Sequence, residues 1–304
     1  MKKTAIISIQ LVFISITTFG QSNQYQNDIA DAGIEQTSTI TNFDTTKTKR
    51  EVPWFVERFK ISAGFYEAMN NTNIKVGTNS GSIGTTIDFE NSLGFTKYSP
   101  SFFADIQWRS TSRSRFILSY YNLRRDAKYK LRESIDFGNN TYDINADVYA
   151  YFNTAIYRFS YGYAIFSKPK YELGLLIGTH IIGAKAGIGL DTNVASTEVS
   201  DNFGVTAPLP DFGIWGGYAF TNRLALNAEI DYLAVKINTI NGKILAYNLS
   251  IIYKATRNLN FSTGFSGLNF KVDAYNDNLN GHLRWGNNGI LFKATYTFGN
   301  KNWR

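Results

Sequence analysis

The feature that most constrains this chain is an alternation of apolar and polar residues with a period of two. In the segment 289–299, GILFKATYTFG, apolar side chains stand at Ile290, Phe292, Tyr296 and Phe298, with mostly polar residues between them. Successive side chains of a β-strand point to opposite faces, so the pattern predicts a strand whose two faces meet different environments. Ten such segments follow one another: 58–68, 101–110, 114–123, 154–166, 171–184, 211–220, 223–235, 244–255, 259–267 and 289–299. The sequence therefore predicts an all-β fold.

Composition excludes several other classes of protein. The 304 residues are 18% charged and 43% hydrophobic, which argues against a disordered chain. The absence of cysteine excludes a disulfide framework, a thiol catalyst and a cysteine zinc site. After the N-terminal stretch no apolar run is long enough for a membrane-spanning helix. The net charge of +7 is spread along the chain, so nucleic acid binding is not predicted.

The N-terminal residues have the pattern of a secretory signal peptide. A basic start, MKK, precedes a short apolar stretch and small or hydroxyl residues that lead to a cleavage position before Gln21. We expect residues 1–20 to be this signal; a true membrane helix is the weaker alternative because the apolar run is short. Residues 21–54 are rich in Thr, Asn, Gln and Asp, and are expected to be a mobile polar periplasmic tail, with one short helix as the alternative. Residues 55–299 are then the folded domain and 300–304 a C-terminal tail.

The connectors between the alternating segments differ in length in a regular way. Short ones lie at 110–113, 167–170, 221–222 and 256–258, and longer polar stretches separate them. Short turns at one end and long loops at the other are typical of transmembrane barrels. Aromatic residues also gather beside the short turns, where a ring can lie half in lipid and half in water: Trp108, Tyr163, Phe166, Tyr171, Phe220, Tyr253 and Phe261. We predict a transmembrane antiparallel up-and-down β-barrel of about ten strands, with eight or twelve as alternatives.

The end of the alternating region carries a further signal. Gly289, Phe292, Tyr296 and Phe298 are spaced as in the C-terminal aromatic signal of outer-membrane barrel proteins, although residues after Phe298 extend the chain further. The region 55–298 resembles the small bacterial outer-membrane barrels of the OmpA-like and OmpW-like type. The resemblance implies an outer-membrane location and contact with outer-membrane lipids and lipopolysaccharide. It also implies recognition of the last strand by the barrel-assembly machinery, and a monomer that binds no nucleic acid.

The parity of each segment predicts which side chains point into the barrel. Inward positions hold both signs of charge in near balance, so we expect a network that largely fills a narrow lumen. Its predicted members are Asp105, Arg109, Arg158, Glu172, His180, Glu229, Asp231 and Lys254. In particular, Arg109, Arg158 and Lys254 are expected to find partners among Asp105, Glu229 and Asp231. Two long polar stretches, 73–95 and 129–144, are expected to stand above the membrane as hairpins.

The sequence gives little support for an enzyme. The two histidines, His180 and His282, lack the His-x-Ser spacing of outer-membrane phospholipases and the Asp-x-His spacing of omptin-type proteases. Glu229 and Asp231 share one face of a strand and could serve acid–base chemistry, but pairing with arginine is the favoured interpretation. No cofactor, metal or catalytic residue is predicted. We expect a structural or surface-interaction role, with a narrow channel for small or hydrophobic solutes as the alternative.

Overall fold

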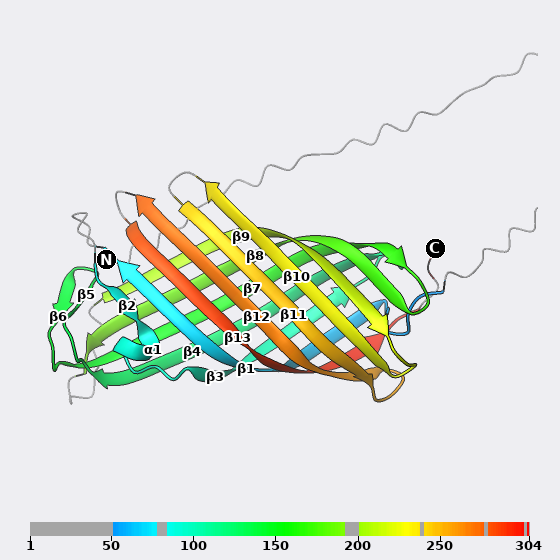
Figure 1. Cartoon of the computed structure of the whole chain (residues 1–304), viewed down its shortest axis with the longest axis horizontal. Helices are drawn as coiled ribbons and strands as arrows, with labels where there is room; N and C mark the ends of the chain where they lie inside the picture. The colour runs from blue at the N-terminus through cyan, green and yellow to red at the C-terminus, as the bar shows by residue number, and fades with distance from the viewer. Residues whose placement is uncertain are drawn as a thin grey trace, which may run out of the picture. The chain divides into compact units, whose positions relative to one another are not determined.

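A computed structural model describes part of the chain as follows: residues 51–77, 84–191, 201–237, 240–276, 279–300 and 303. The predicted signal peptide, residues 1–20, and the greater part of the predicted tail lie outside these residues. The described residues form an antiparallel sheet that closes on itself, together with a small two-stranded sheet (Figure 1). In the described part of the chain, no helix is long and apolar enough to cross a membrane.

Ten long strands form the closed sheet within the described residues. In chain order they are β1 (Phe59–Val76), β3 (Tyr98–Trp108), β4 (Ser114–Lys130), β7 (Asp147–Ser167), β8 (Tyr171–Leu190), β9 (Asp201–Ala219), β10 (Leu224–Ile237), β11 (Ile240–Lys254), β12 (Leu259–Asn276) and β13 (Leu279–Phe298). Each pairs with the next, and β13 pairs with β1 from Phe59 opposite Phe298 to Val76 opposite Gly281. The predicted all-β class and the ten-stranded antiparallel barrel are confirmed.

Threonine side chains shape three of the short turns. The Thr111 hydroxyl oxygen accepts a hydrogen bond from the backbone N–H of Ser114 at 3.0 Å. Thr221 and Thr256 accept the equivalent bonds three residues ahead, at 2.9 and 3.0 Å. Such local bonds hold a chain reversal without help from the rest of the fold. These turns define one end of the barrel, called here the turn end; the opposite end is the loop end.

Four short elements lie at the loop end. Strand β2 (Thr86–Asp88) pairs with the upper part of β1 and leads into the single helical turn α1 (Phe89–Ser92). The side chain of Asp88 caps this turn by accepting the backbone N–H of Asn91 at 2.9 Å. Strands β5 (Ile135–Phe137) and β6 (Asn140–Tyr142) form a separate hairpin between β4 and β7. None of these four elements enters the closed ring, which keeps the ring at ten strands.

The outer face of the barrel toward the turn end is apolar. Each of the ten long strands carries at least one large apolar side chain there that is exposed, and Phe65 is 67% exposed. The seven aromatic residues predicted beside the short turns are all on this exposed surface. A water-soluble protein does not expose a continuous apolar surface that surrounds it on every side. This surface is suited to contact with the hydrocarbon of a membrane. A closed barrel can lie in lipid because it has no unpaired strand edge.

Toward the loop end, the two faces of the strands exchange character. On β1 the outward residues change from Phe65 and Met69 to Asn73, while the inward residues change from Ser62 to Ile74. Strands β7 and β13 change in the same way. The outer face here meets water instead of lipid, so the hydrophobic effect drives apolar side chains to the inside. The barrel thus has a membrane part and a water-exposed part, called here the head.

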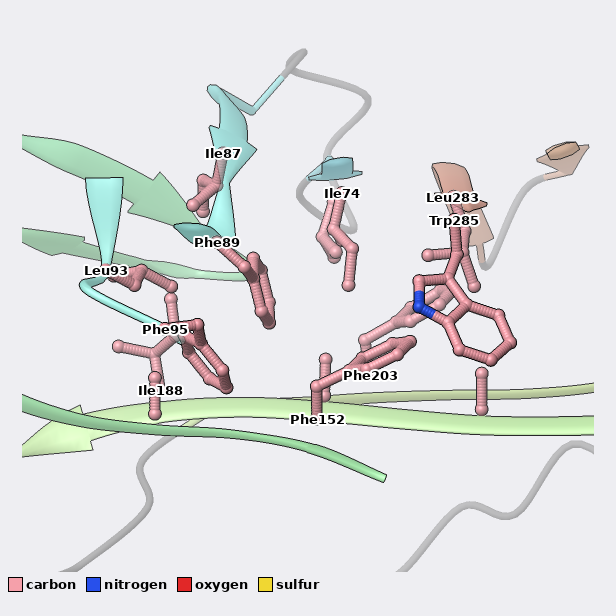
Figure 2. Close-up of a cluster of buried hydrophobic side chains, with 14 of the residues drawn as sticks. Ile74, Ile87, Phe89, Leu93, Phe95, Phe152, Ile188, Phe203, Leu283 and Trp285 are labelled. Carbon is pink, nitrogen blue, oxygen red and sulfur yellow. The ribbon is translucent and has the colours of Figure 1, made fainter. Parts of the chain in front are cut away.

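The inside of the head is filled by an apolar core. Its members include Ile74, Ile87, Phe89, Leu93, Phe95, Phe152, Ile188, Phe203, Leu283 and Trp285, which face one another in Figure 2. Strand β2, helix α1 and the β5–β6 hairpin add side chains to this core, and the Tyr142 hydroxyl donates to the Ile188 carbonyl at 2.9 Å. The sequence predicted polar residues inside; inward parity holds in the head too, but the inward residues there are apolar.

Candidate functional site

A cavity of about 290 Å³ occupies the membrane part of the barrel, and we call it the lumen cavity. Charged and polar residues from the inward faces of the strands line it: Lys60, Asp105, Gln107, Arg109, Arg115, Ser119, Arg158, Glu172, His180, Asn227, Glu229, Asp231, Asn248 and Lys293. Aromatic side chains of Tyr66, Phe103 and Tyr121 complete the wall. Charged side chains and aromatic side chains therefore both line this space.

Arg158 and Glu229 form the centre of the charged network. Arg158 on β7 reaches across to β10, where its Nη1 lies 2.6 Å from Glu229 Oε1 and its Nη2 lies 2.8 Å from Asp231 Oδ2. The second oxygen of Glu229 contacts Arg115 Nη2 at 2.6 Å. Glu229 and Asp231 are two residues apart on one strand, so both can reach the same guanidinium. Each charge in this group has a partner, which a buried charge requires.

A second pair lies closer to the turn end. Arg109 Nη2 contacts Glu172 Oε1 at 2.6 Å, and Arg109 Nη1 donates to the Ser112 carbonyl at 3.0 Å. Trp215 separates this pair from the central group, with its ring centre 3.7 Å from the Arg115 guanidinium carbon and 5.5 Å from that of Arg109. The planar guanidinium groups thus combine ion pairing with stacking on an aromatic face.

Two inward glycines make room for the Trp215 ring. A methyl group at Gly162 would come within 2.8 Å of the Trp215 ring nitrogen, and one at Gly174 within 2.9 Å of a ring carbon. The ring is almost fully buried as a result. Gly174 lies directly opposite Trp215 on the neighbouring strand, and the close approach explains why the inward face carries glycine there.

His180 belongs to a different pair within the lumen. Its Nδ1 lies 2.6 Å from Asp211 Oδ2, and both side chains are buried. A methyl group at Gly178 would lie 2.9 Å from Asp211 Oδ1, so the absence of a side chain at Gly178 leaves room for the Asp211 carboxylate. Asp211 was not among the predicted members of the network, although it begins an alternating segment. The strand register that puts it opposite Gly178 brings it to His180. His282 is not among the residues that line the lumen cavity, and it contacts Asp273.

Asp105 and Lys254 lie apart from these groups. Asp105 accepts a hydrogen bond from the Ser62 hydroxyl at 3.1 Å, and its other oxygen lies 3.6 Å from Lys293 Nζ. The Lys254 ammonium lies 5.5 Å from the centre of the Trp54 ring, at the turn end. The structure therefore brings Arg158 to Glu229 and Asp231 as the sequence suggested, but places Arg109 with Glu172 and Lys254 beside an aromatic ring.

Side chains of the segment before β1 pack at the turn end of the lumen cavity. Phe55 and Val56 are buried against Ala219 and Ala225 at the barrel mouth. Trp54 anchors the same segment, because its ring nitrogen donates to the Thr221 carbonyl at 2.8 Å. Residues just before β1 therefore lie at the turn-end mouth of the barrel.

The apolar core and a layer of hydrogen-bonded side chains lie between the cavity and the loop end. The Tyr66 hydroxyl donates to the Ser266 and Asn287 carbonyls at 2.6 and 2.9 Å. Asn70 Oδ1 accepts from the Asn287 amide at 2.7 Å and from the Trp285 ring nitrogen at 3.3 Å. All four of the side chains that meet here, those of Tyr66, Asn70, Trp285 and Asn287, are buried. The roof of the cavity is therefore well packed.

The described residues form a closed antiparallel barrel. Every long strand of it carries apolar side chains on the outer face, and the interior at the same level is polar. Only closed barrels and helices can span a bilayer, because lipid offers no partner for a free backbone group. The chain has the fold of an outer-membrane β-barrel. Its location is the bacterial outer membrane, where barrels of this kind reside.

Comparison with known proteins finds similarity only at a low level. No protein-family model and no curated protein sequence matches the chain. Among solved structures, the outer membrane protease OmpT of Escherichia coli has a TM-score of 0.49 at 10% identity, covering 80% of this chain and 98% of its own. The translocator domain of the autotransporter NalP of Neisseria meningitidis has a TM-score of 0.44 at 11% identity, with coverages of 79% and 88%.

A third similar structure is the attachment invasion locus protein Ail of Yersinia pestis. Its TM-score is 0.32 at 9% identity, and the match covers 78% of this chain and 98% of that one. The three names describe a protease, a translocator and an attachment protein. Similarity at this level assigns none of those activities to the chain.

Proposed function

We propose that the protein is a closed, non-conducting outer-membrane barrel whose function lies in the head that it holds above the membrane. The observation that carries the proposal is the apolar core of buried side chains inside the head. Close packing of such a core argues against a continuous path for water or ions. It also gives the head a fixed surface, as the core of a soluble domain does.

The pairing of charges in the membrane part supports the same role. Arg109, Arg115 and Arg158 each lie within 2.6 Å of a carboxylate oxygen. Charged side chains that are paired in this way are poorly suited to line an ion path, because displacing one of them leaves a buried charge unpaired. We propose no enzymatic activity for these groups, and regard their role as structural. Outer-membrane lipid, lipopolysaccharide and, during insertion, the barrel-assembly machinery are the proposed partners of a monomer.

A narrow channel for small or hydrophobic solutes is the second candidate. The lumen cavity favours it, since about 290 Å³ approaches the volume of small-molecule sites. Passage would require Phe55 and Val56 to leave the mouth at the turn end and the apolar core to open at the other. Two independent closures make this the weaker proposal.

Single-channel recording on the refolded protein in a planar bilayer distinguishes the two. The closed barrel is expected to give no steady conductance, and its insertion is checked by resistance of the membrane part to added protease. Replacing Glu229 and Asp231 together by alanine removes both acids from Arg158 and is expected to destabilise the barrel and produce a leak. Large, steady conductance of the unmodified protein, with a double variant that folds normally, would replace the closed barrel by the channel.

A further inference from the structure

Three basic residues lie directly opposite one another on three neighbouring strands of the outer face. Lys243 on β11 pairs in register with Lys271 on β12, and Lys271 pairs with Arg284 on β13. All three side chains are exposed. Residues opposite each other on adjacent strands have their β-carbons about 5 Å apart, and like charges in such positions repel. We call these three residues the cation row.

The cation row lies where the lipid-facing surface ends. Descending the outer face of β11 from Lys243, the next two residues are Leu245 and Tyr247, and exposed Leu249 and Ile251 follow. The Lys243 ammonium also lies 5.6 Å from the centre of the exposed Tyr232 ring on β10. An aromatic ring beside a lysine is the usual combination at the boundary between hydrocarbon and water.

On β12 and β13 a polar layer separates the cation row from the hydrocarbon level. Asn269 and Asn288 exchange two hydrogen bonds at 2.9 and 3.0 Å, and the Tyr247 hydroxyl donates to Asn288 at 2.9 Å. Apolar outward residues begin below this layer, with Phe265 and Ile290. The cation row therefore lies beyond the hydrocarbon level, on the side of the lipid headgroups and the water outside them.

The protein itself offers the cation row little negative charge. Among the described residues, Asp273 is the acid that contacts it, with Oδ2 3.1 Å from Lys271 Nζ, and Asp273 also contacts His282. Lys236 lies on the neighbouring strand β10 and Lys75 on β1, both facing outward, and these add positive charge on either side. An external anion bound between three like charges lowers their electrostatic repulsion.

We propose that the cation row binds the phosphate groups of lipids in the outer leaflet of the membrane. The loop end of an outer-membrane barrel faces the outside of the cell, so the adjacent leaflet is the outer one. Phosphate offers several strong acceptor oxygens, and a guanidinium between two ammonium groups can hold more than one of them. The three strands form a site for a lipid with multiple phosphates. The acyl chains of this lipid would lie against Leu245 and Leu249.

The test compares diphosphoryl lipid A with its dephosphorylated form. Both are titrated into the full-length refolded barrel in zwitterionic detergent, and binding is measured by native mass spectrometry. The variant K243Q/K271Q/R284Q neutralises the cation row, and K128Q/K130Q/R132Q makes the same charge change farther up the head. Each cation near an anionic lipid surface contributes about five-fold in affinity, so the row variant should lose on the order of 100-fold of the preference for the phosphorylated lipid.

The control triple variant and R284K should keep most of the preference, because R284K retains the charge. Folding of every variant is checked by its heat-dependent mobility on a gel, and the outward positions make loss of folding unexpected. Equal preference in the row variant and the unmodified barrel would overturn the proposal, as would an equal loss in the control. If inorganic phosphate displaces lipid A as effectively as unlabelled lipid A does, the row is a general anion site and the proposal also fails.

Discussion

Replacing Glu229 by alanine should be among the most damaging single changes in the barrel. Its two oxygens each contact a different guanidinium at 2.6 Å, from Arg115 and from Arg158. The side chain of Glu229 is 12% exposed and those of the two arginines are 6% and 15% exposed, so water cannot replace the lost partner well. Removal of one member of a buried ion pair costs about 3–5 kcal/mol. Arg158 keeps Asp231, but Arg115 loses its ion-pair partner and keeps its contact with the Trp215 ring, so we expect a value within this range.

The measurement is equilibrium unfolding in urea of the barrel refolded into lipid vesicles. Tryptophan fluorescence is a suitable signal, because the Trp215 ring lies against Arg115 and reports this part of the lumen. Glu133 is exposed and outside the lumen, so Glu133→Ala is a matched control that should change stability by less than about 0.5 kcal/mol. A cost for Glu229→Ala below about 1 kcal/mol, or one equal to the control, would refute the view that the lumen charges hold the barrel together.

Three further expectations concern the lipid face, the head and the mouth. Arginine at Leu226 or Ile230 should cost about 2–4 kcal/mol in the same assay, whereas arginine at the inward Asn227 should be tolerated far better; equal costs would contradict the assignment of faces. Trp285→Ala should cost about 3–5 kcal/mol and speed hydrogen exchange of the head amides, and unchanged exchange would argue against a single apolar core. Phe55→Ala should accelerate labelling of a cysteine placed at 227 by a water-soluble thiol reagent, and an unchanged rate would show that Phe55 does not close the mouth.

Strand number and lumen-facing residues could be predicted from the sequence because both depend on local pattern. The alternation gives each strand its faces, and turns such as the one at Thr221 are encoded by a single hydroxyl close in sequence. Of the inward charges predicted from parity, Lys254 alone is not in the wall of the lumen cavity among the described residues; it lies at the turn end.

The partners of those charges could not be predicted in the same way. Which side chains meet across a lumen depends on the stagger accumulated over all the strands, and no local pattern contains it. Arg109 contacts Glu172 and not the acids expected for it, because β3 and β8 place these two at one level. Ile74 and Val76 alternate with Asn73 and Lys75 in the sequence of the head. This alternation does not say which of the two faces points inward unless the level at which the lipid ends is known.

The exchange of faces along the strands also sets the depth of the barrel in the membrane. Sinking would carry Asn71 and Asn73 into hydrocarbon, while rising would expose Phe65 to water, and either displacement costs free energy. The barrel therefore needs no separate anchor to keep its level. Moving the point of exchange by two residues on every strand would raise or lower the head by about 5 Å, given the rise and tilt of barrel strands. The reach of the head beyond the cell surface is thus encoded in the position at which polar and apolar residues change places.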